Sequence, residues 1–328
     1  MSHKTVFLTG AGGAAVPGLI RILKSKGYRV LAGDMDPHAV GLYTADQGFK
    51  LPQGDSPEFS KKLAELCQQE KVDVLIPLVD EELPASAALG SESLAVLVPD
   101  KTFIELCLDK YKLMQAFEKA GIPFPRTKLA SEGAHDLKFP IIAKPRVGRG
   151  SRGVEVFQSI DEFNSYRGTL PSAKDILIQE YIDGLEFTVS VCVWRDGRVQ
   201  AVIPKEIIKK RGVTQLAVTR KNSVIEKVCI KIQEQLQADG PFNVQLRIDK
   251  QGVPFVFEIN PRFSTSVSLT IASGFDELNY LVDRALGVRS SQNISWKEGV
   301  VLLRQTLDEF ITEDKFLKRM KEFTGEGQ

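Results

Sequence analysis

The order of expected strands and helices constrains this fold more than any single motif. Over the first hundred residues, short apolar strands alternate with amphipathic helices. The strands are expected at 5–10, 29–34, 72–80 and 94–100, and the helices at 18–27 and 56–71. Because continuously apolar strands that alternate with helices are typical of parallel sheets covered on both faces, this part predicts a doubly wound α/β unit.

The character of the chain changes after about residue 100. A helix capped by Asp109 and ended by Gly121 comes first. Strand-like segments then dominate, at 140–145, 153–157, 175–182, 186–194, 199–203, 242–248 and 253–260. Helices interrupt them at 160–167, 222–238 and 275–286. Turn signals at 196–197 and 249–252 mark antiparallel hairpins. The fold class is therefore α/β first and α+β afterwards.

Composition narrows the class of protein. With 43 Lys and Arg against 42 Asp and Glu in 328 residues, no strong field favours nucleic acid or membrane as a partner. No apolar run approaches the roughly 20 residues that span a bilayer, and the amino terminus enters a strand directly. The four cysteines are far apart and only three histidines occur, so neither a disulfide framework nor a zinc site is expected. A cytoplasmic protein fits this composition.

A glycine-rich turn follows the first expected strand. Gly10, Gly12 and Gly13 precede an amphipathic helix, and Asp34 ends the second strand, 22 residues after Gly12. This spacing is typical of dinucleotide binding, in which the acid accepts from a ribose hydroxyl. A glycine turn also serves simply to pack a helix closely on its strand. An NAD(P) site and a structural turn therefore both remain open.

A second glycine-rich segment, residues 141–157, lies between two expected strands. Its glycines, at 148, 150 and 153, alternate with arginines at 146, 149 and 152. Glycines let backbone N–H groups approach a polyphosphate, and the cations neutralise it. Lys144 precedes this loop on an apolar strand, where it needs an anionic partner. The alternative is a solvated basic hairpin tip.

The segment "FNVQLRIDKQGVPFVFEINPR" (242–262) predicts a hairpin with one polar face. A turn centred on Lys250-Gln251 makes Gln245 and Glu258 diagonal neighbours, with Asn260 one step further. Oxygen ligands without His or Cys suit Mg²⁺ shared with phosphates. Arg262 adds a cation directly after them. The alternative is the solvated face of an ordinary hairpin.

Two further features suggest nucleotide contacts. Residues 179–182, Gln-Glu-Tyr-Ile, end a strand whose edge could read an adenine, and Glu186 is placed to accept from ribose hydroxyls. Lys112 lies in the first turn of its helix, where the dipole disfavours a cation unless an anion is near. An exposed acidic hairpin and a solvated lysine are the alternatives.

Together these motifs resemble the ATP-grasp superfamily, most closely one synthetase half of carbamoyl phosphate synthase large subunits. "FNVQ" followed by "EINPR" is the most specific match, and the likeness extends over about residues 1–275. The resemblance implies a Rossmann-like pre-ATP-grasp domain at 1–102. It implies a small ATP-grasp subdomain at 103–182, and a large subdomain with a C-terminal extension at 183–328.

The resemblance also implies ATP-dependent ligation, in which a small carboxylate becomes an acylphosphate and an amine or similar nucleophile then attacks. ATP would be bound by Lys112, Lys144, Gly150, Ser151, Gln179, Glu180, Tyr181, Ile182, Glu186 and Phe257. One or two Mg²⁺ ions, or Mn²⁺, would be held by Gln245, Glu258 and Asn260. Arg262 and Lys144 would be catalytic. The basic segment 205–222 is expected to form a loop that closes over this site.

The chain departs from carbamoyl phosphate synthase because it carries one synthetase half and no amidotransferase signature. A stand-alone carboxylate–amine ligase, with homodimer assembly a plausible state, is the preferred hypothesis. Its acceptor would lie at the edge of the parallel sheet, near Gly12, Gly13, Asp80, Glu81 and Glu82. A module that binds ATP or ADP without turnover and an NAD(P)-dependent reductase are the alternatives.

Overall fold

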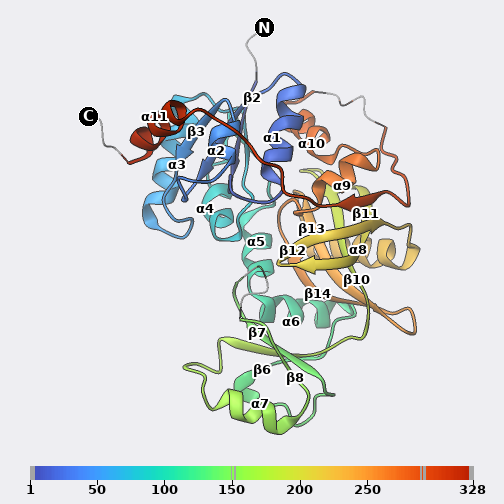
Figure 1. The fold of residues 1–328 in the computed structure, drawn as a ribbon. Coiled ribbons are helices and arrows are strands. Elements are labelled where there is room, and N and C mark those ends of the chain that lie inside the picture. Colours follow the sequence, from blue (N-terminus) through green and yellow to red (C-terminus); the bar gives the residue numbers. More distant parts are fainter. Residues whose placement is uncertain (1–3, 149, 151–152, 289, 291–292, 325–328) are drawn as a thin grey trace.

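Three β-sheets organise the chain (Figure 1). The computed structural model describes residues 4–148, 150, 153–288, 290 and 293–324. An N-terminal unit and a large antiparallel unit lie side by side, and a small antiparallel unit projects at the bottom of the view. This arrangement confirms the expected α/β unit followed by antiparallel sheets.

The N-terminal unit is a five-stranded sheet in the order β3-β2-β1-β4-β5, with parallel pairing throughout. Its strands are β1 (Thr5–Thr9), β2 (Arg29–Asp34), β3 (Gln47–Lys50), β4 (Val74–Ile76) and β5 (Ala95–Val96). Its helices are α1 (Val16–Ser25), α2 (Gly41–Thr44), α3 (Pro57–Gln69) and α4 (Leu83–Ala87). Val6 and Leu8 enter one core and Phe7 the other. This alternation gives the predicted doubly wound sheet its two buried faces.

Two helices, α5 (Lys101–Leu108) and α6 (Lys110–Ala120), leave the N-terminal unit. The Asp109 carboxylate accepts from two backbone N–H groups of α6, and Gly121 ends the helix at φ 61°. Leu113 and Phe117 enter the same core as Val244 of the larger sheet. In α5, Phe103 enters this core and Ile104 enters a core of the N-terminal unit. By packing, α6 therefore lies with the larger sheet and α5 lies between the two large units, whereas the predicted boundary at 103 groups both helices with the small unit.

The small unit is an antiparallel sheet in the order β6-β9-β7-β8. Its strands are β6 (Thr127–Leu129), β7 (Ile141–Pro145), β8 (Glu155–Phe157) and β9 (Ile176–Glu180). Helix α7 (Ile160–Arg167) covers the sheet, and Phe163 packs edge-on against Phe157. Strands β7 and β9 of this unit face the larger sheet across a cleft.

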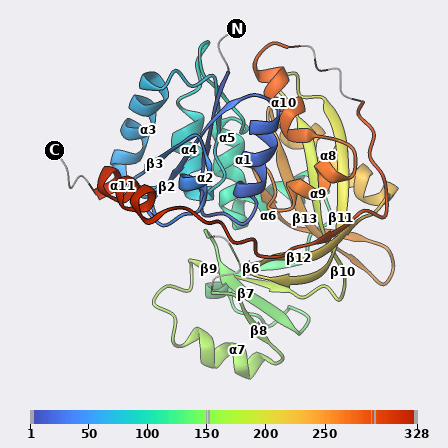
Figure 2. The same ribbon diagram turned by 45° about the horizontal axis from the view of Figure 1, so that its top comes forward.

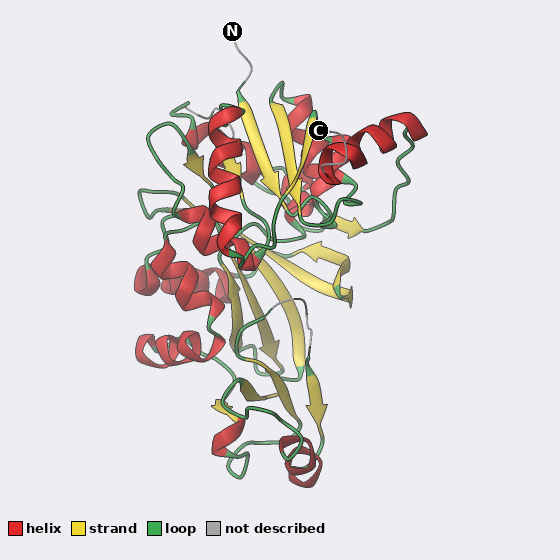
Figure 3. Ribbon diagram, turned by 90° about the vertical axis from the view of Figure 1, so that its left-hand side faces the viewer, coloured by secondary structure: helices red, strands yellow, loops and turns green. Residues whose placement is uncertain are grey.

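The larger unit is a six-stranded antiparallel sheet in the order β14-β13-β10-β11-β12-β15. Figure 3 draws the strands of the molecule in yellow and its helices in red. The strands of the larger unit are β10 (Gly184–Val193), β11 (Val199–Arg211), β12 (Val213–Thr219), β13 (Phe242–Asp249), β14 (Pro254–Asn260) and β15 (Val301–Leu303). Helix α8 (Ser223–Leu236) packs on one face, and α9 (Val267–Ala272) and α10 (Glu277–Ala285) on the other. Leu278 shares a core with Leu19 of α1, so the two large units are joined by continuous apolar packing.

The prediction that residues 205–222 form a loop is wrong. This segment continues β11, turns at Gly212 with φ 68°, and returns as β12. The strands pair from Lys205 opposite Thr219 to Arg211 opposite Val213, with an irregular stretch between Ile207 and Lys210. Its many cations obscured the alternation of Ile207, Val213 and Ala217, which suits a strand.

The last residues return to the N-terminal unit (Figure 2). After β15 the chain crosses to helix α11 (Glu313–Thr324), whose Phe316 stacks on Tyr43 at 5.5 Å between ring centroids. The four cysteines are buried and free. Within the described ranges, no helix combines the length and apolar character that a bilayer crossing requires.

Candidate functional site

Most residues expected to bind ATP line one cavity of about 250 Å³ between the small and larger sheets. They are Lys144, Gly150, Gln179, Glu180, Tyr181, Ile182, Glu186 and Phe257, joined by Gln245 and Glu258. Ser151 lies outside the described residues. Residues from five strands, β7, β9, β10, β13 and β14, thus meet in one cleft, which we call the nucleotide cavity.

The hairpin of β13 and β14 brings the expected metal ligands closer together than predicted. Gln245 pairs directly with Glu258, and Asn243 with Asn260. A bulge after Gln245 shifts the register, so the diagonal arrangement inferred from a turn at 250–251 is wrong. Among the described residues, no three His, Cys, Asp or Glu side chains are grouped to hold a metal. The candidate site therefore consists of one carboxylate and amide oxygens.

A lysine that the sequence argument missed stands beside this carboxylate. The Lys110 ammonium lies 3.6 Å from Glu258 Oε1 and donates to the Gly148 carbonyl, and its side chain is almost buried. Lys112 points away: its side chain is 63% exposed and reaches Asp109 at 3.8 Å. Two residues rotate a helix position by about 200°, so only one of these lysines can face the cavity. The structure therefore places Lys110, and not the predicted Lys112, in the lining of the nucleotide cavity.

Lys144 is buried on the floor of the nucleotide cavity. Its ammonium donates to Gln179 Oε1 at 3.0 Å and to the Phe257 carbonyl at 3.4 Å. Burial lowers the pKa of Lys144 to about 8; Glu258 opposes this shift and the like charge of Lys110 adds to it. Two clustered cations with one carboxylate leave an excess positive charge, which suits a polyphosphate.

Another part of the cavity lining contains residues 179–182, which are predicted to contact the adenine, and Glu186, which is predicted to accept from the ribose hydroxyls. Glu186 accepts from Arg247 at 2.8 Å and from Lys210 at 3.2 Å. Burial raises the pKa of Glu186, but the two cations outweigh it and the net shift is downward. Arg247 also stacks on Tyr181, 4.7 Å from the ring centroid, and donates to the Ile182 carbonyl. Arg247 and Lys210 were missed because strand alternation places them correctly only when the pairing of three strands is known.

Arg146, the one arginine of the second glycine-rich segment that the structure describes, forms an ion pair within the protein, whereas the sequence predicted that it neutralises a polyphosphate. Arg146 forms a bidentate pair with Asp109, with N–O distances of 2.8 and 2.7 Å. Burial acts to raise the pKa of Asp109, and Arg146 more than offsets it. This pair fastens β7 to the start of α6 and thereby fixes Lys110. Arg149 and Arg152 lie outside the described residues.

A second cavity, of about 550 Å³, opens at the carboxyl edge of the parallel sheet. We call it the acceptor-side cavity. Gly12, Gly13, Glu81, Glu82 and Arg262 all contribute to its lining. Four of the five residues expected at the acceptor are therefore found together there, with Arg262 from the other half of the molecule.

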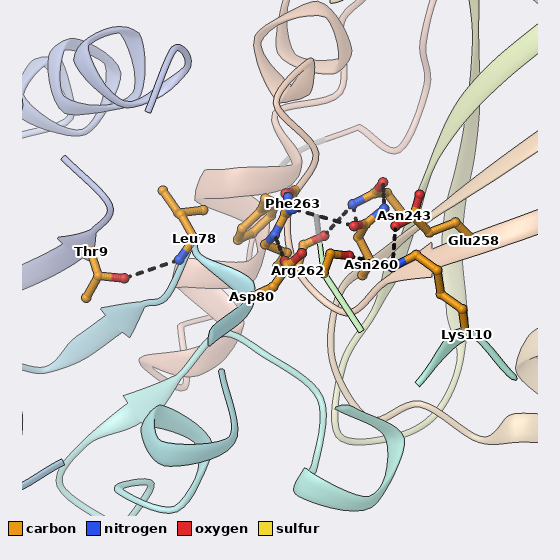
Figure 4. A network of polar contacts seen from close by, with 10 residues as sticks. Thr9, Leu78, Asp80, Lys110, Asn243, Glu258, Asn260, Arg262 and Phe263 are labelled. Carbon is orange, nitrogen blue, oxygen red and sulfur yellow. Dashed lines mark hydrogen bonds and ion pairs between the residues drawn. The ribbon is translucent and has the colours of Figure 1, made fainter. Parts of the chain in front are cut away.

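The fifth, Asp80, does not face this cavity. Its carboxylate is held by Arg262 Nε, and both side chains are nearly buried (Figure 4). Burial disfavours the charge of Arg262, yet Asp80 and Glu258 raise its pKa overall. Asn243 extends the network by donating to the Arg262 carbonyl at 2.9 Å. Asp80 therefore orients Arg262 from across the unit boundary.

The glycine turn near the amino terminus is closed by its own acid. Asp34 Oδ2 accepts from Gly12 N at 2.7 Å, and Oδ1 accepts from Asp36 N at 2.9 Å. In a dinucleotide site this carboxylate would be turned toward a ribose. Here both of its oxygens already hold the loops that rim the acceptor-side cavity, which favours the structural interpretation of the motif.

Family models match along most of the chain. Residues 7–98 match the PylC-like N-terminal domain, and residues 108–218 the D-ala D-ala ligase C-terminus. Residues 172–306 match the ATP-grasp in the biosynthetic pathway with Ter operon. The last of these matches identifies an ATP-grasp domain in the chain. The expected family and class, an ATP-grasp protein of the ligase group, are confirmed.

Relatives of this ATP-grasp protein are named carbamoyl phosphate synthases. The protein of Methanobrevibacter smithii is 23% identical over 84% of this chain and 79% of its own length. The large chain of Pyrococcus furiosus is 27% identical over 51% of this chain, which spans only 18% of that larger protein. The chain thus spans most of the length of the first relative and about a fifth of the second.

Solved ATP-grasp structures share the fold at low identity. Biotin carboxylase from Campylobacter jejuni aligns with a TM-score of 0.72 and 17% identity over 90% of this chain and 73% of that one. An L-amino acid ligase from Bacillus licheniformis gives 0.69 and 20% over 87% and 74%. N5-carboxyaminoimidazole synthetase from Staphylococcus aureus, solved with ADP, gives 0.71 and 18% over 88% and 79%.

Lys110 and Lys112, in the first turn of α6, give a direct test of the nucleotide cavity. Lys110→Ala is expected to weaken Mg-ATP binding by about ten- to a hundredfold, because one charged hydrogen-bond donor is worth roughly 1.5–3 kcal/mol. Lys112→Ala on the same helix is expected to change it by less than about twofold, as for most exposed charges. Equilibrium titration of both variants measures this, and the reverse order would contradict the cavity assignment.

The shifted Lys144 predicts a pH dependence of ATP affinity. Bound phosphate favours the charged ammonium, so affinity is full below the pKa of about 8 and declines as pH rises through that value. The dissociation constant of Mg-ATP, measured from about pH 6.5 to 9.5, should rise by up to about tenfold per pH unit above this point. Lys144→Arg, whose guanidinium stays protonated over this whole pH range, should remove the rise. An unchanged profile in that variant would assign the effect to another group.

Proposed function

We propose that this protein is an ATP-dependent ligase that activates a small carboxylate as an acylphosphate and joins it to an amine or similar nucleophile. One observation carries the proposal: residues at and just after the end of β14 line both cavities. Glu258 lines the nucleotide cavity, and Arg262, four residues later, lines the acceptor-side cavity. A phosphoryl group and its acceptor would thus be held against one short segment of chain.

On the nucleotide side, Lys110 and Lys144 would neutralise the phosphates, and residues 180–182 with Glu186 would hold the adenosine. Gln245, Glu258 and Asn260 fit Mg²⁺, because carboxylate and amide oxygens are its preferred protein ligands and Glu258 already faces a cation, Lys110. When bound, Mg²⁺ neutralises charge on the phosphates and orients them for transfer. The neighbours solved with ADP or with its magnesium salt support the nucleotide and the metal.

On the acceptor side, the substrate carboxylate would attack the γ-phosphorus and release ADP, and the nucleophile would then displace inorganic phosphate from the acylphosphate. Arg262, oriented by Asp80, is placed to hold the carboxylate and then the acylphosphate. Glu81 and Glu82 in the same cavity suit a cationic amine. The protein thus contributes positioning and charge neutralisation.

The experiment is ADP and phosphate release from Mg-ATP by the full chain, with amino acids and small carboxylates, bicarbonate included, singly and in pairs. Hydroxylamine would trap an acylphosphate as a hydroxamate even when the natural amine is missing from the panel. We expect ADP formation that requires a carboxylate and is abolished by EDTA. Tight ATP binding without ADP in any mixture would favour a regulatory module, and binding of NAD(P)H in place of ATP would favour a reductase.

A further inference from the structure

The C-terminal extension ends β15 with an arginine that touches three separate parts of the molecule. Arg304 Nη1 donates to the Ala14 carbonyl at 2.9 Å, and Nη2 to the Thr265 carbonyl at 2.7 Å. Its Nε donates to the Thr214 carbonyl at 2.8 Å. The first acceptor lies in the N-terminal glycine turn, the second between Arg262 and α9, and the third at the start of β12.

These three acceptors surround the acceptor-side cavity. Ala14 and Thr265 line it directly, and Thr214 follows Val213, which also lines it. The guanidinium is a planar fork whose donors point outward in fixed directions, so one side chain can hold three carbonyls at once. The chain after Arg304 adds independent ties to the N-terminal unit, such as the ion pair of Glu309 with Arg21 at 2.7 Å.

We infer that Arg304 is a positioning residue for the acceptor-side cavity. It holds the glycine turn at Ala14, the segment between Arg262 and α9, and the start of β12 in fixed positions around this cavity. It acts through the backbone that carries Arg262 and has no part in the nucleotide cavity. The inference rests on the proposed function only in assigning this cavity to the acceptor. The chain from Arg304 onward thereby supports a cavity that is lined by the N-terminal unit and the larger unit.

The test compares Arg304→Ala and Arg304→Lys with Arg21→Ala in the full chain. Hydrogen exchange followed by mass spectrometry should accelerate by about tenfold in peptides spanning 10–16, 213–216 and 262–267 for both Arg304 variants. A lysine ammonium is compact and cannot reach three separate carbonyls, so it should not rescue. Arg21→Ala, which releases another tie of the same extension, should leave these peptides unchanged. Mg-ATP affinity should stay within about twofold in all three variants.

A kinetic split completes the test once the substrate panel yields turnover. The KM of the acceptor should rise by about ten- to a hundredfold in Arg304→Ala, because small misplacements of bound groups carry losses of this size, while the KM of ATP is unchanged. Unchanged exchange in the three peptides would overturn the inference, as would parallel loss of ATP binding in both Arg304 variants. Failure of the panel would count against the proposed ligase, whereas the exchange data would still decide the role of Arg304.

Discussion

Glu258→Gln is expected to lower ATP turnover by about 10²- to 10³-fold, because a metal ion supplies several kcal/mol of charge stabilisation in phosphoryl transfer. Glu258 is the one carboxylate among the three proposed ligands, and it pairs directly with Gln245. Its loss would also remove the charge that holds up the pKa of Lys144 and faces Lys110. When the rate of ADP release is measured against Mg²⁺ concentration, the variant should therefore show a lower maximal rate and a higher Mg²⁺ midpoint.

The matched control is Glu206→Gln. Glu206 lies on β11 of the same sheet and pairs with Arg220 at 2.7 Å, outside the lining of either cavity. We expect turnover and the Mg²⁺ midpoint of this variant to remain within about twofold of the unsubstituted protein. If Glu258→Gln kept half of its activity with an unchanged Mg²⁺ midpoint, the metal assignment to β13 and β14 would be wrong.

Lys205→Met is expected to lower the free energy of unfolding by about 3–5 kcal/mol, the usual cost of removing one partner from a buried charge pair. Lys205 is fully buried, and its ammonium donates to the hydroxyls of Ser190, Ser264 and Thr270. Glu277, also buried, accepts from Ser190 at 2.9 Å in the same cluster. Burial lowers the pKa of Lys205 to about 8, with Glu277 opposing the shift. The variant would leave that carboxylate without its cation.

Denaturant unfolding followed by tryptophan fluorescence measures this loss. Lys209→Met, an exposed position on the same strand, should change stability by no more than about 0.5 kcal/mol. Adding Glu277→Gln to Lys205→Met should recover much of the loss, since a neutral cluster no longer carries an unbalanced charge. A loss below about 1 kcal/mol in Lys205→Met alone would mean that the cluster does not depend on an ion pair.

Local patterns in the sequence were sufficient for much of the fold. The alternation of apolar strands with helices predicted the parallel sheet, and the cap at Asp109 with Gly121 predicted the limits of α6. These features depend on neighbours close in sequence, where spacing alone fixes geometry. The segment 205–222 failed because its dense charges resemble a loop, although pairing with β10 and β15 makes it a strand hairpin.

The same distinction runs through the candidate site. The residues of the β13–β14 hairpin and the hinge at 179–182 could be grouped from their order in the chain. Lys110 could not be distinguished from Lys112, because the choice depends on which side of α6 faces the larger sheet. Asp80 was predicted to contact the acceptor because its true partner, Arg262, lies 182 residues later in the chain and could not be foreseen from the sequence.

By itself, the sequence determined the α/β-then-antiparallel order, the superfamily and most residues of the nucleotide cavity, because each depends on motifs whose parts lie within one or two consecutive elements. Only the tertiary structure decided which lysine faces Glu258, that Asp34 closes the glycine turn, and that Asp80 serves Arg262. It also showed that Arg304 ties the extension to three walls of a cavity. These contacts join residues far apart in sequence, and the distances and directions that create them exist only after the sheets have packed together.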